Sequence, residues 1–293
     1  MSVRVHTAVI AALLALAGTA ACAPEDAATP ATGSSTNASP SADACTKDQL
    51  DLVSAGTFTV GTDKPAYEPW FVDDDPNNGK GFESAVAYAV AERLGFAKAE
   101  VKWIVVPFTN AYAPGDKKFD IDINQVSISD TRRKAVDFST GYYDVAQTIV
   151  SVKGSKIDGA TSVAALKEAK LGAQVGTTSY TAITDQIQPT EKPAVYDTND
   201  LAVQALKNGQ VDGIVVDLPT AFYVSAAQLD DGTIVGQLPP GSGTPDQFGL
   251  VLAKGSSLTS CVSQAVDALK SDGTLADLEA QWLAGTDGAP VLS

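Results

Sequence analysis

The sequence contains a single histidine, His6, which lies in an N-terminal segment with the pattern of an export signal. Once such a signal is removed, the chain has no Ser–His or Cys–His pair for nucleophilic catalysis and no histidine to bind a metal ion. We therefore predict no metal, no cofactor and no catalytic residue. Acid–base chemistry by carboxylates stays open at this point, although no pair of acidic residues stands out for it.

Basic residues are also scarce, because 20 Lys and Arg against 35 Asp and Glu give a net charge of -15. Phosphate binding requires clustered basic residues, so the composition excludes nucleic acid as a partner. A ligand with a negative group would need one dedicated cation in its site. Long apolar runs are absent beyond the N-terminal segment, so we expect a soluble body that is long enough for two compact lobes.

The N-terminal segment combines Arg4, an apolar stretch at residues 8–17 and small residues at 18–21, which predicts a signal peptide over residues 1–21. Cys22 follows directly, and small residues that end in cysteine resemble the lipobox of bacterial lipoproteins. The resemblance implies that Cys22 is acylated and anchors the chain at the outer face of the bacterial cytoplasmic membrane. Ordinary signal cleavage nearby, without a lipid, is the alternative.

Only three cysteines are present. If Cys22 carries a lipid, Cys45 and Cys261 remain as a pair in an oxidising compartment, and we predict a disulfide between them. Residues 22–44 are rich in Ala, Thr, Ser and Pro and have little apolar bulk. Such a segment cannot bury enough surface to offset its ordering entropy, so we predict a disordered tether.

From Cys45 onward, segments with strand and helix periodicity alternate along the chain, which indicates an α/β fold with mixed, mostly parallel sheets flanked by helices. Residues 110–118, with Pro114 and Gly115, indicate a loop. The predicted strands cover residues 57–61, 101–106, 119–126, 171–175, 211–216 and 248–253, and the predicted helices cover residues 82–94, 180–187, 201–207, 258–273 and 275–282.

The two amphipathic helices near the end of the chain have no further sheet to cover, so we expect them to return to the first of two lobes. The second lobe is then inserted between two crossings of the chain, at residues 143–148 and 243–248. This organisation assigns residues 45–145 to the first lobe, residues 146–245 to the second lobe and residues 246–293 to the return.

Five groups of short motifs follow one another between residues 57 and 283. Together they resemble the polar-amino-acid family, family 3, of the solute-binding proteins of ABC transporters. The resemblance implies two lobes joined by a two-strand hinge, and a monomer that captures a free amino acid in the cleft and delivers it to an ABC permease and its ATPase. The motifs are residues 60–63 with Tyr67 and Pro69; residues 79–83; residues 127–132 with 136–139 and 142–143; residues 176–179; and residues 209–213 leading to Asp217.

An amino acid presents a carboxylate and an ammonium group close together, so its site needs a fixed cation and an anion. Arg132 lies in the first turn of a helix that Ser129 and Asp130 begin, where a guanidinium and free amides can bind a carboxylate. Family members use the arginine of this motif in that way. The resemblance assigns Asp217, which ends an apolar strand, to the ammonium group, and matches Ser127 to a hydroxyl that contacts the ligand. The alternatives are a surface charge for Arg132 and a helix cap for Asp217.

Further contacts are predicted from both lobes. Thr177 and Thr178 follow Gly176 and open the next helix, so they offer hydrogen-bond donors from the second lobe, or they serve only as turn residues. Tyr67 and Phe108 match aromatic positions that sandwich the aliphatic stem of the ligand. The alternative for Phe108 is a role in the core alone.

Three polar residues are candidates for the far end of the ligand's side chain. Asp63 follows the first strand at a position that meets this end in the family, and Gln174 and Gln125 are further candidates. None of them is cationic, so we predict a polar neutral or basic amino acid such as glutamine, arginine or lysine. An acidic ligand would require Lys64 or Lys80 to reach the site. A dehydratase-like enzyme on the same fold and a purely local role for Asp63 as the cap of its loop also stay open.

Overall fold

The computed structural model describes residues 45–240, 246–285 and 288–293. The predicted signal peptide at residues 1–21, the predicted acylation site Cys22 and the predicted tether through residue 44 lie outside the described residues. Residues 243–245 of the second predicted crossing lie outside them as well. Within the described ranges, no helix has the length and apolar character needed to cross a membrane.

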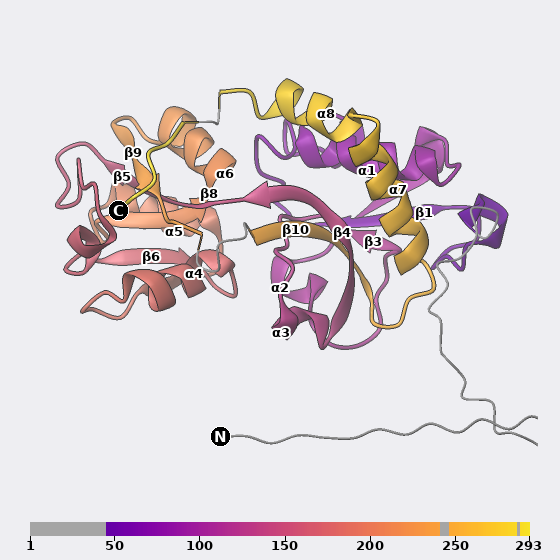
Figure 1. Cartoon of the computed structure of the whole chain (residues 1–293), viewed down its shortest axis with the longest axis horizontal. Helices are drawn as coiled ribbons and strands as arrows, with labels where there is room; N and C mark the ends of the chain where they lie inside the picture. Colours follow the sequence, from indigo (N-terminus) through magenta and orange to yellow (C-terminus); the bar gives the residue numbers. More distant parts are fainter. Residues whose placement is uncertain (1–44, 241–245, 286–287) are drawn as a thin grey trace, which may run out of the picture. The chain divides into compact units, whose positions relative to one another are not determined.

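The first sheet has five strands in the order β2, β1, β3, β10, β4 (Figure 1). β1 (Phe58–Thr62) pairs in parallel with β2 (Val101–Val105) and with β3 (Ile121–Asp122). β10 (Asp246–Ala253) runs antiparallel to β3 and to the long β4 (Val136–Val145). All five residues of β1 are buried, which is the pattern expected when a parallel strand is covered on both faces.

The second sheet also has five strands, in the order β7, β6, β8, β5, β9. β6 (Leu171–Gln174) is parallel to β7 (Ala194–Tyr196) and to β8 (Gly213–Asp217). β5 (Gln147–Val152) is antiparallel to β8 and to β9 (Gly232–Gln237). The predicted fold class, two mixed sheets flanked by helices, is confirmed. Parallel pairs make up half of the pairings in each sheet, because the strands next to the crossings of the chain pair antiparallel.

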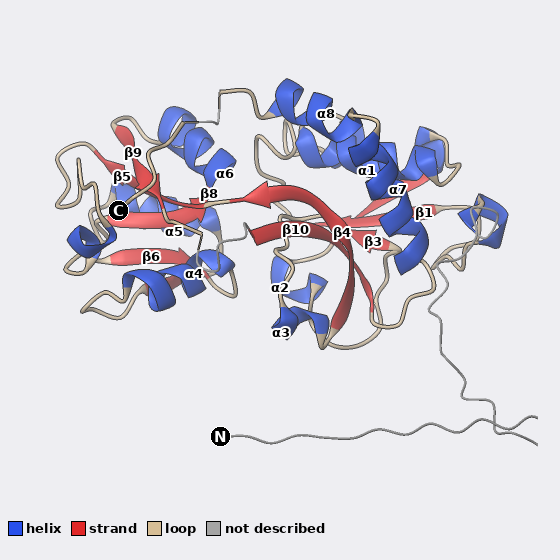
Figure 2. Ribbon diagram, in the orientation of Figure 1, coloured by secondary structure: helices blue, strands red, loops and turns tan. Residues whose placement is uncertain are grey.

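Helices flank both sheets (Figure 2). α1 (Phe82–Arg93), α7 (Thr259–Ser271) and α8 (Thr274–Trp282) pack against one another, and α7 also packs on β4. α5 (Asn199–Lys207) packs on strands of the second sheet. The remaining turns of helix are α2 (Phe108–Ala111), α3 (Asp130–Arg133), α4 (Thr178–Ala182), α6 (Leu218–Tyr223), the 3-10 segments Lys47–Gln49, Pro76–Asn78, Lys98–Glu100 and Val163–Leu166, and the π segments Ile183–Ile187 and Val224–Gln228.

The predicted strand over residues 119–126 is wrong for most of its length, because only Ile121 and Asp122 form β3. Gln125 has a φ of 49°, in the left-handed region that a strand cannot contain. The chain therefore leaves the sheet after β3 and turns back toward α3. This turn carries residues of the candidate site described below.

Two chain segments lead directly from a strand of one sheet to a strand of the other. In the first, a single residue, Ala146, separates β4 from β5. The second runs from the end of β9 at Gln237 to the start of β10 at Asp246. A hydrogen bond also joins the two lobes, since the buried Trp70 indole donates to the Thr220 hydroxyl at 2.9 Å.

The assignment of all residues 246–293 to the first lobe needs a correction at its end. The backbone of Gln237 donates to the carbonyl of Pro290 at 2.7 Å and accepts from the amide of Leu292 at 2.9 Å. Leu292 is buried and packs in the hydrophobic cluster that contains Ile149 and Val215 of the second sheet. These final residues join the second lobe because Leu292 fills its core and the edge of β9 offers free backbone partners.

The structure pairs Cys45 with Cys261 in a disulfide, with Cα atoms 5.2 Å apart. Cys261 lies in α7 and is buried in the core of the first lobe. The bond closes a loop with a sequence separation of 216 residues. It therefore ties the start of the described chain to the helix that follows β10.

Loss of this disulfide should destabilise the protein. Because a long closed loop restricts the unfolded chain strongly, the Cys45→Ala/Cys261→Ala variant should lose about 2–5 kcal/mol of unfolding free energy, measured by urea denaturation. Peptide mapping of the secreted protein under non-reducing conditions is the complementary measurement. Free thiols on both Cys45 and Cys261 would contradict the pairing.

Candidate functional site

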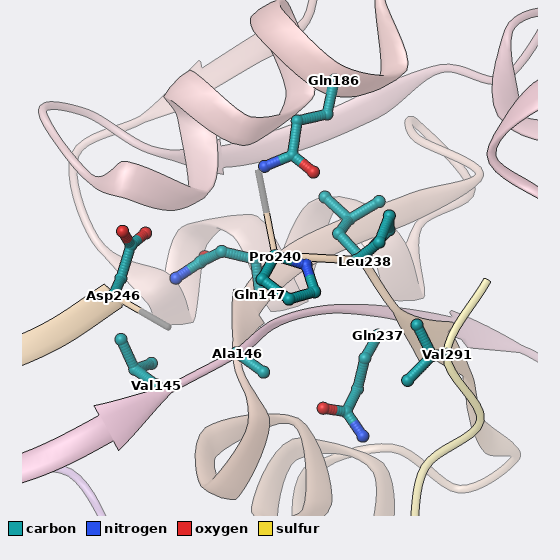
Figure 3. A pocket seen from close by; sticks show the side chains of 10 residues that line it. Val145, Ala146, Gln147, Gln186, Gln237, Leu238, Pro240, Asp246 and Val291 are labelled. Carbon is teal, nitrogen blue, oxygen red and sulfur yellow. The ribbon is translucent and has the colours of Figure 1, made fainter. Parts of the chain in front are cut away.

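A cavity of about 280 Å³ lies where β4 passes into β5 (Figure 3). Its walls include Gln147, Gln186, Leu238 and Asp246. Among the described residues that line it, Asp246 is the one charged side chain, so this cavity offers no cation for a carboxylate. It does not provide the pair of opposite charges that the sequence predicts for the site.

A smaller cavity of about 30 Å³ contains that pair. Its wall brings together residues at or just after the ends of β1, β3, β6 and β8, and thus residues of both lobes. Of the ten ligand contacts predicted from the sequence, all but Ser127 line it. The lining residues are Asp63, Tyr67, Phe108, Asn124, Gln125, Arg132, Gln174, Thr177, Thr178, Ser179, Asn199 and Asp217.

Arg132 is the cation of this cavity and is buried rather than displayed on the surface. The Ser129 hydroxyl caps α3 by accepting from the Arg132 amide at 3.2 Å. The guanidinium donates to the Ser127 carbonyl at 2.6 Å and to the Gly176 carbonyl at 2.9 Å. Since Gly176 belongs to the second lobe, Arg132 links the lobes across the cavity.

Two aromatic rings hold the guanidinium in place. Its carbon lies 4.4 Å from the ring centre of Tyr112 and 5.7 Å from that of Phe108. Phe108 also belongs to a core cluster with Val106 and Phe119, so its predicted roles in the cavity and in the core coexist. Cation–π contacts to both rings favour one orientation of the Arg132 side chain.

Asp217 ends β8 and supplies the carboxylate on the opposite wall. Its side chain does not cap α6, although the residue stands at the N-cap position. Gln147 instead donates to the Asp217 carboxylate at 2.8 Å, while the Gln147 oxygen accepts from the Ser179 hydroxyl at 2.6 Å. Desolvation raises the pKa of Asp217 to about 7, against the opposing effects of the Gln147 hydrogen bond and the Arg132 charge.

Thr177 and Thr178, which follow Gly176, make different contacts. The Thr177 hydroxyl caps α4 by accepting from the Tyr180 amide at 3.2 Å and donates to the Gln174 carbonyl at 2.8 Å. The Thr178 hydroxyl lies 3.0 Å from that of Ser127. Ser127 therefore reaches the site through Thr178, as a second contact between the lobes.

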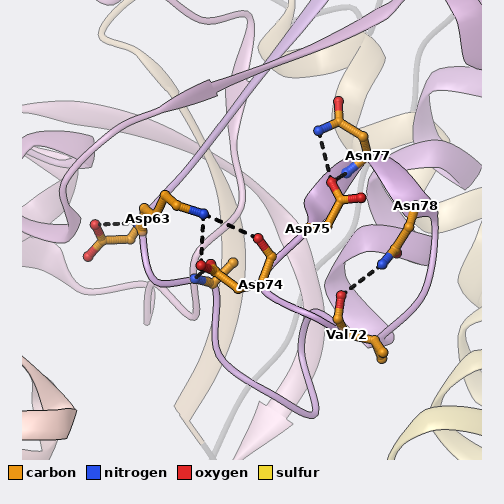
Figure 4. Close-up of polar contacts among 8 residues, drawn as sticks. Asp63, Val72, Asp74, Asp75, Asn77 and Asn78 are labelled. Atoms are coloured by element: carbon orange, nitrogen blue, oxygen red, sulfur yellow. Dashed lines mark hydrogen bonds and ion pairs between the residues drawn. The ribbon is translucent and has the colours of Figure 1, made fainter.

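Asp63 lies on the cavity wall, and both of its carboxylate oxygens accept hydrogen bonds from backbone amides. Figure 4 shows Asp63 and the loop that carries Asp74. One oxygen accepts from Lys64 at 2.7 Å and the other from Phe108 at 3.2 Å. Burial raises the Asp63 pKa, and these two bonds oppose the shift. The Lys64 ammonium pairs with Asp74 at 2.7 Å, outside the residues that line the cavity.

Tyr67 and Asn124 bring further polar groups to the wall. Burial, with the nearby Asp200 charge as the next cause, raises the pKa of Tyr67 to about 12, so its hydroxyl remains protonated. Asn124 is buried, and its side-chain nitrogen has no hydrogen-bond partner among the described residues. A buried donor without a partner is costly, so a ligand that presents an acceptor here would relieve that cost.

Sequence reasoning missed Asn124, Ser179 and Asn199. Asn124 fell inside the predicted strand, where alternation alone did not single it out. Asn199 opens α5, whose Thr198 side chain caps the helix by accepting from the Leu201 amide. A Thr followed by Asn and Asp before an apolar run is typical of a helix start. This signal could have placed the first residue of the predicted helix at 199 instead of 201.

Two α/β lobes that close on a polar cavity, with a cation on one wall and a carboxylate on the other, define the class of two-lobed solute-binding proteins. Residues 58–285 match the model of the bacterial extracellular solute-binding proteins, family 3. The chain belongs to that family.

Individual relatives agree with this assignment. The chain is 30% identical over 232 residues to the L-cystine-binding protein TcyJ of Escherichia coli (strain K12), a match that covers 78% of this chain and 82% of that protein. The structure of an ancestral arginine-binding protein bound to glutamine superposes with a TM-score of 0.65, 32% identity and coverage of 78% of this chain and 97% of that one.

An ancestral amino-acid-binding protein, AncCDT-1, described as a precursor of cyclohexadienyl dehydratase, is a further structural relative. It superposes with a TM-score of 0.63 and 31% identity, and the match covers 78% of this chain and 95% of that one. The fold is thus similar to that of a protein from which an enzyme arose, and to that of binding proteins.

The raised pKa of Asp217 predicts a pH dependence of the ligand-free protein. The unfolded chain loses this proton near pH 4, but the folded protein keeps it to about pH 7. The unfolding free energy should therefore decrease as the pH rises between these values, because the folded state binds more protons there. Urea denaturation should show a smaller decrease for Asp217→Asn.

A ¹³C NMR titration of the Asp217 carboxyl carbon measures the same property directly. The midpoint should lie near pH 7. A midpoint in the ordinary range of exposed aspartates, about pH 4, would contradict the described environment of this group.

Proposed function

We propose that this protein is the amino-acid-binding component of an ABC import system. The observation that carries the proposal is that buried Arg132 and the Asp217 carboxyl group line one cavity. A guanidinium can bind the α-carboxylate of an amino acid in a bidentate manner, and an ionised aspartate can bind its α-ammonium group. The relatives named above, which bind amino acids, support this assignment.

Closure of the lobes is the proposed capture step. Arg132 and Ser127 of the first lobe contact Gly176 and Thr178 of the second, so an amino acid between these residues touches both lobes at once. Such a ligand favours the closed state, because that state alone satisfies both of its charged ends. The segments that connect β4 to β5 and β9 to β10 then act as the two-strand hinge.

The proposed ligand is a polar neutral or basic amino acid. Arg132 is the one cationic side chain among the described residues that line the cavity, and it is assigned to the α-carboxylate. A second carboxylate on the ligand would face Asp63 with no matching cation, since Lys64 is paired with Asp74. Glutamine, arginine and lysine fit these conditions. Cystine, the ligand named for TcyJ, fits them less directly, because its far end carries a second carboxylate together with a second ammonium group that Asp63 could bind.

We also propose that the protein binds its ligand without converting it, and that acylated Cys22 and the 22–44 tether hold a monomer at the outer face of the cytoplasmic membrane. The extracellular location of the family supports export. A tethered binder can reach the permease and its ATPase while remaining attached to the membrane. Mass spectrometry of the mature N-terminus and of the ligand after incubation tests both parts.

The ligand class can be tested by thermal-shift measurements with L-glutamine, L-arginine, L-lysine, L-cystine, L-glutamate and L-aspartate. A ligand that binds only the folded state raises the melting temperature, and the rise increases with its affinity. We expect the largest shift with a neutral or basic member of the panel. A shift with glutamate or aspartate alone would overturn the ligand class, and no shift after extension of the panel to all the common amino acids would overturn amino-acid binding.

The role of Arg132 in binding can be tested by comparing a variant at this position with a variant at the next residue. Arg132→Ala should weaken binding by about 2–5 kcal/mol in calorimetry, because it leaves the ligand carboxylate buried and unpaired. Arg133 is the matched control: it is the next residue of α3, it is exposed, and it lies over Phe138 instead of the cavity. Arg133→Ala should bind like the wild type, whereas equal losses in the two variants would remove Arg132 from the site.

A further inference from the structure

We infer that Glu83, which does not line the cavity, is a positioning residue for the binding site and acts by holding Gln125 in its left-handed conformation. The inference rests on the proposed function, since the cavity wall that it concerns is the amino-acid site. Glu83 is the second residue of α1 and is completely buried. Gln125 is on the cavity wall.

The backbone of Gln125 requires an external support. Its φ of 49° is uncommon for a residue with a side chain and persists where the surroundings enforce it. The residues around it serve the site: Asn124 lines the cavity, and the Ser127 carbonyl accepts from Arg132. The conformation of this turn therefore sets the position of several groups in the cavity at once.

Glu83 provides that support through both carboxylate oxygens. One oxygen accepts from the Gln125 backbone amide at 2.8 Å and from the Tyr142 hydroxyl, and the other accepts from the Gln125 side-chain amide. An ionised carboxylate accepts at every position, so it matches three donors. A glutamine at position 83 would place its NH₂ group against the side-chain NH₂ group of Gln125, so this contact would be lost unless the Gln125 amide rotated.

The electrostatic surroundings make this arrangement sensitive to protonation. Asp122 on β3, Tyr142 on β4 and Asp217 at the end of β8 are the titratable groups that act on Glu83. Neither oxygen of Asp122 has a hydrogen-bond partner within the described ranges, and burial raises its pKa well above the usual range. Desolvation raises the pKa of Glu83 to about 7, although its three hydrogen bonds oppose the shift.

A double-mutant cycle tests whether Glu83 acts through Gln125. Glycine adopts a positive φ without strain, so Gln125→Gly should make the turn independent of Glu83. The probe is the amino acid that gives the largest thermal shift in the panel described above. Glu83→Gln should weaken its binding about tenfold or more in the wild-type background, but by less than about threefold in the Gln125→Gly background.

The control is Glu92→Gln, an exposed position on the same helix, which should bind the probe like the wild type. Equal losses from Glu83→Gln in both backgrounds, or no loss in either, would overturn the inference. If the wild type binds no amino acid, the proposed function fails, and the inference is then judged by a measurement that uses no ligand.

That second measurement is an NMR titration of the ligand-free wild type, which also applies if Glu83→Gln fails to fold. The backbone amide proton of Gln125 should be shifted downfield and protected from exchange. Its shift should change with pH at the same midpoint as the Glu83 carboxyl carbon. An unprotected Gln125 amide, or one whose shift does not follow Glu83, would overturn the inference whether or not any amino acid binds.

Discussion

The site depends on the burial of one guanidinium group. Removing a charge from water is costly unless hydrogen bonds and opposite charges replace the water. Arg132 meets this requirement with the carbonyls of Ser127 and Gly176, which lie on different lobes, and with the rings of Phe108 and Tyr112. One of the contacts that make its burial possible, the bond to the Gly176 carbonyl, therefore also joins the two lobes across the cavity.

Several buried or half-buried carboxyl groups lie around that single guanidinium group. Asp63, Glu83, Asp122 and Asp217 all have pKa values raised chiefly by desolvation. Carboxyl groups in this situation are poised to accept a cation or a hydrogen-bond donor. In the proposed complex the ligand's ammonium group fills this role at Asp217, and at Glu83 the donors of Gln125 and Tyr142 already fill it.

Much of the architecture could be predicted from the sequence, because apolar periodicity marks elements such as α1 and α7 directly. The pairing of Cys45 with Cys261 followed from cysteine number and the expected acylation of Cys22. Motif resemblance predicted Arg132 and Asp217 as site residues, and both line one cavity, but it could not show that a carbonyl of the second lobe accepts from Arg132. Such a contact depends on how two distant segments meet.

Some features have no local signal. The left-handed Gln125 lies in a run that has the pattern of a strand, and its conformation comes from the buried Glu83, which lies 42 residues earlier in the chain. The association of Leu292 with the second lobe likewise depends on a gap in a distant core and on the free edge of β9. Tertiary contacts override local preference in both places.

In the proposed complex, the ammonium group of the amino acid pairs with ionised Asp217. Because the pKa of Asp217 is raised to about 7 in the ligand-free protein, this group is about half protonated at pH 7 and must lose its proton when the ammonium group binds. Calorimetry at pH 7 in buffers of different ionisation enthalpy measures that proton. We expect release of about half a proton per ligand in the wild type, and less in Asp217→Asn. Binding heats that are identical in all buffers for the wild type would contradict it.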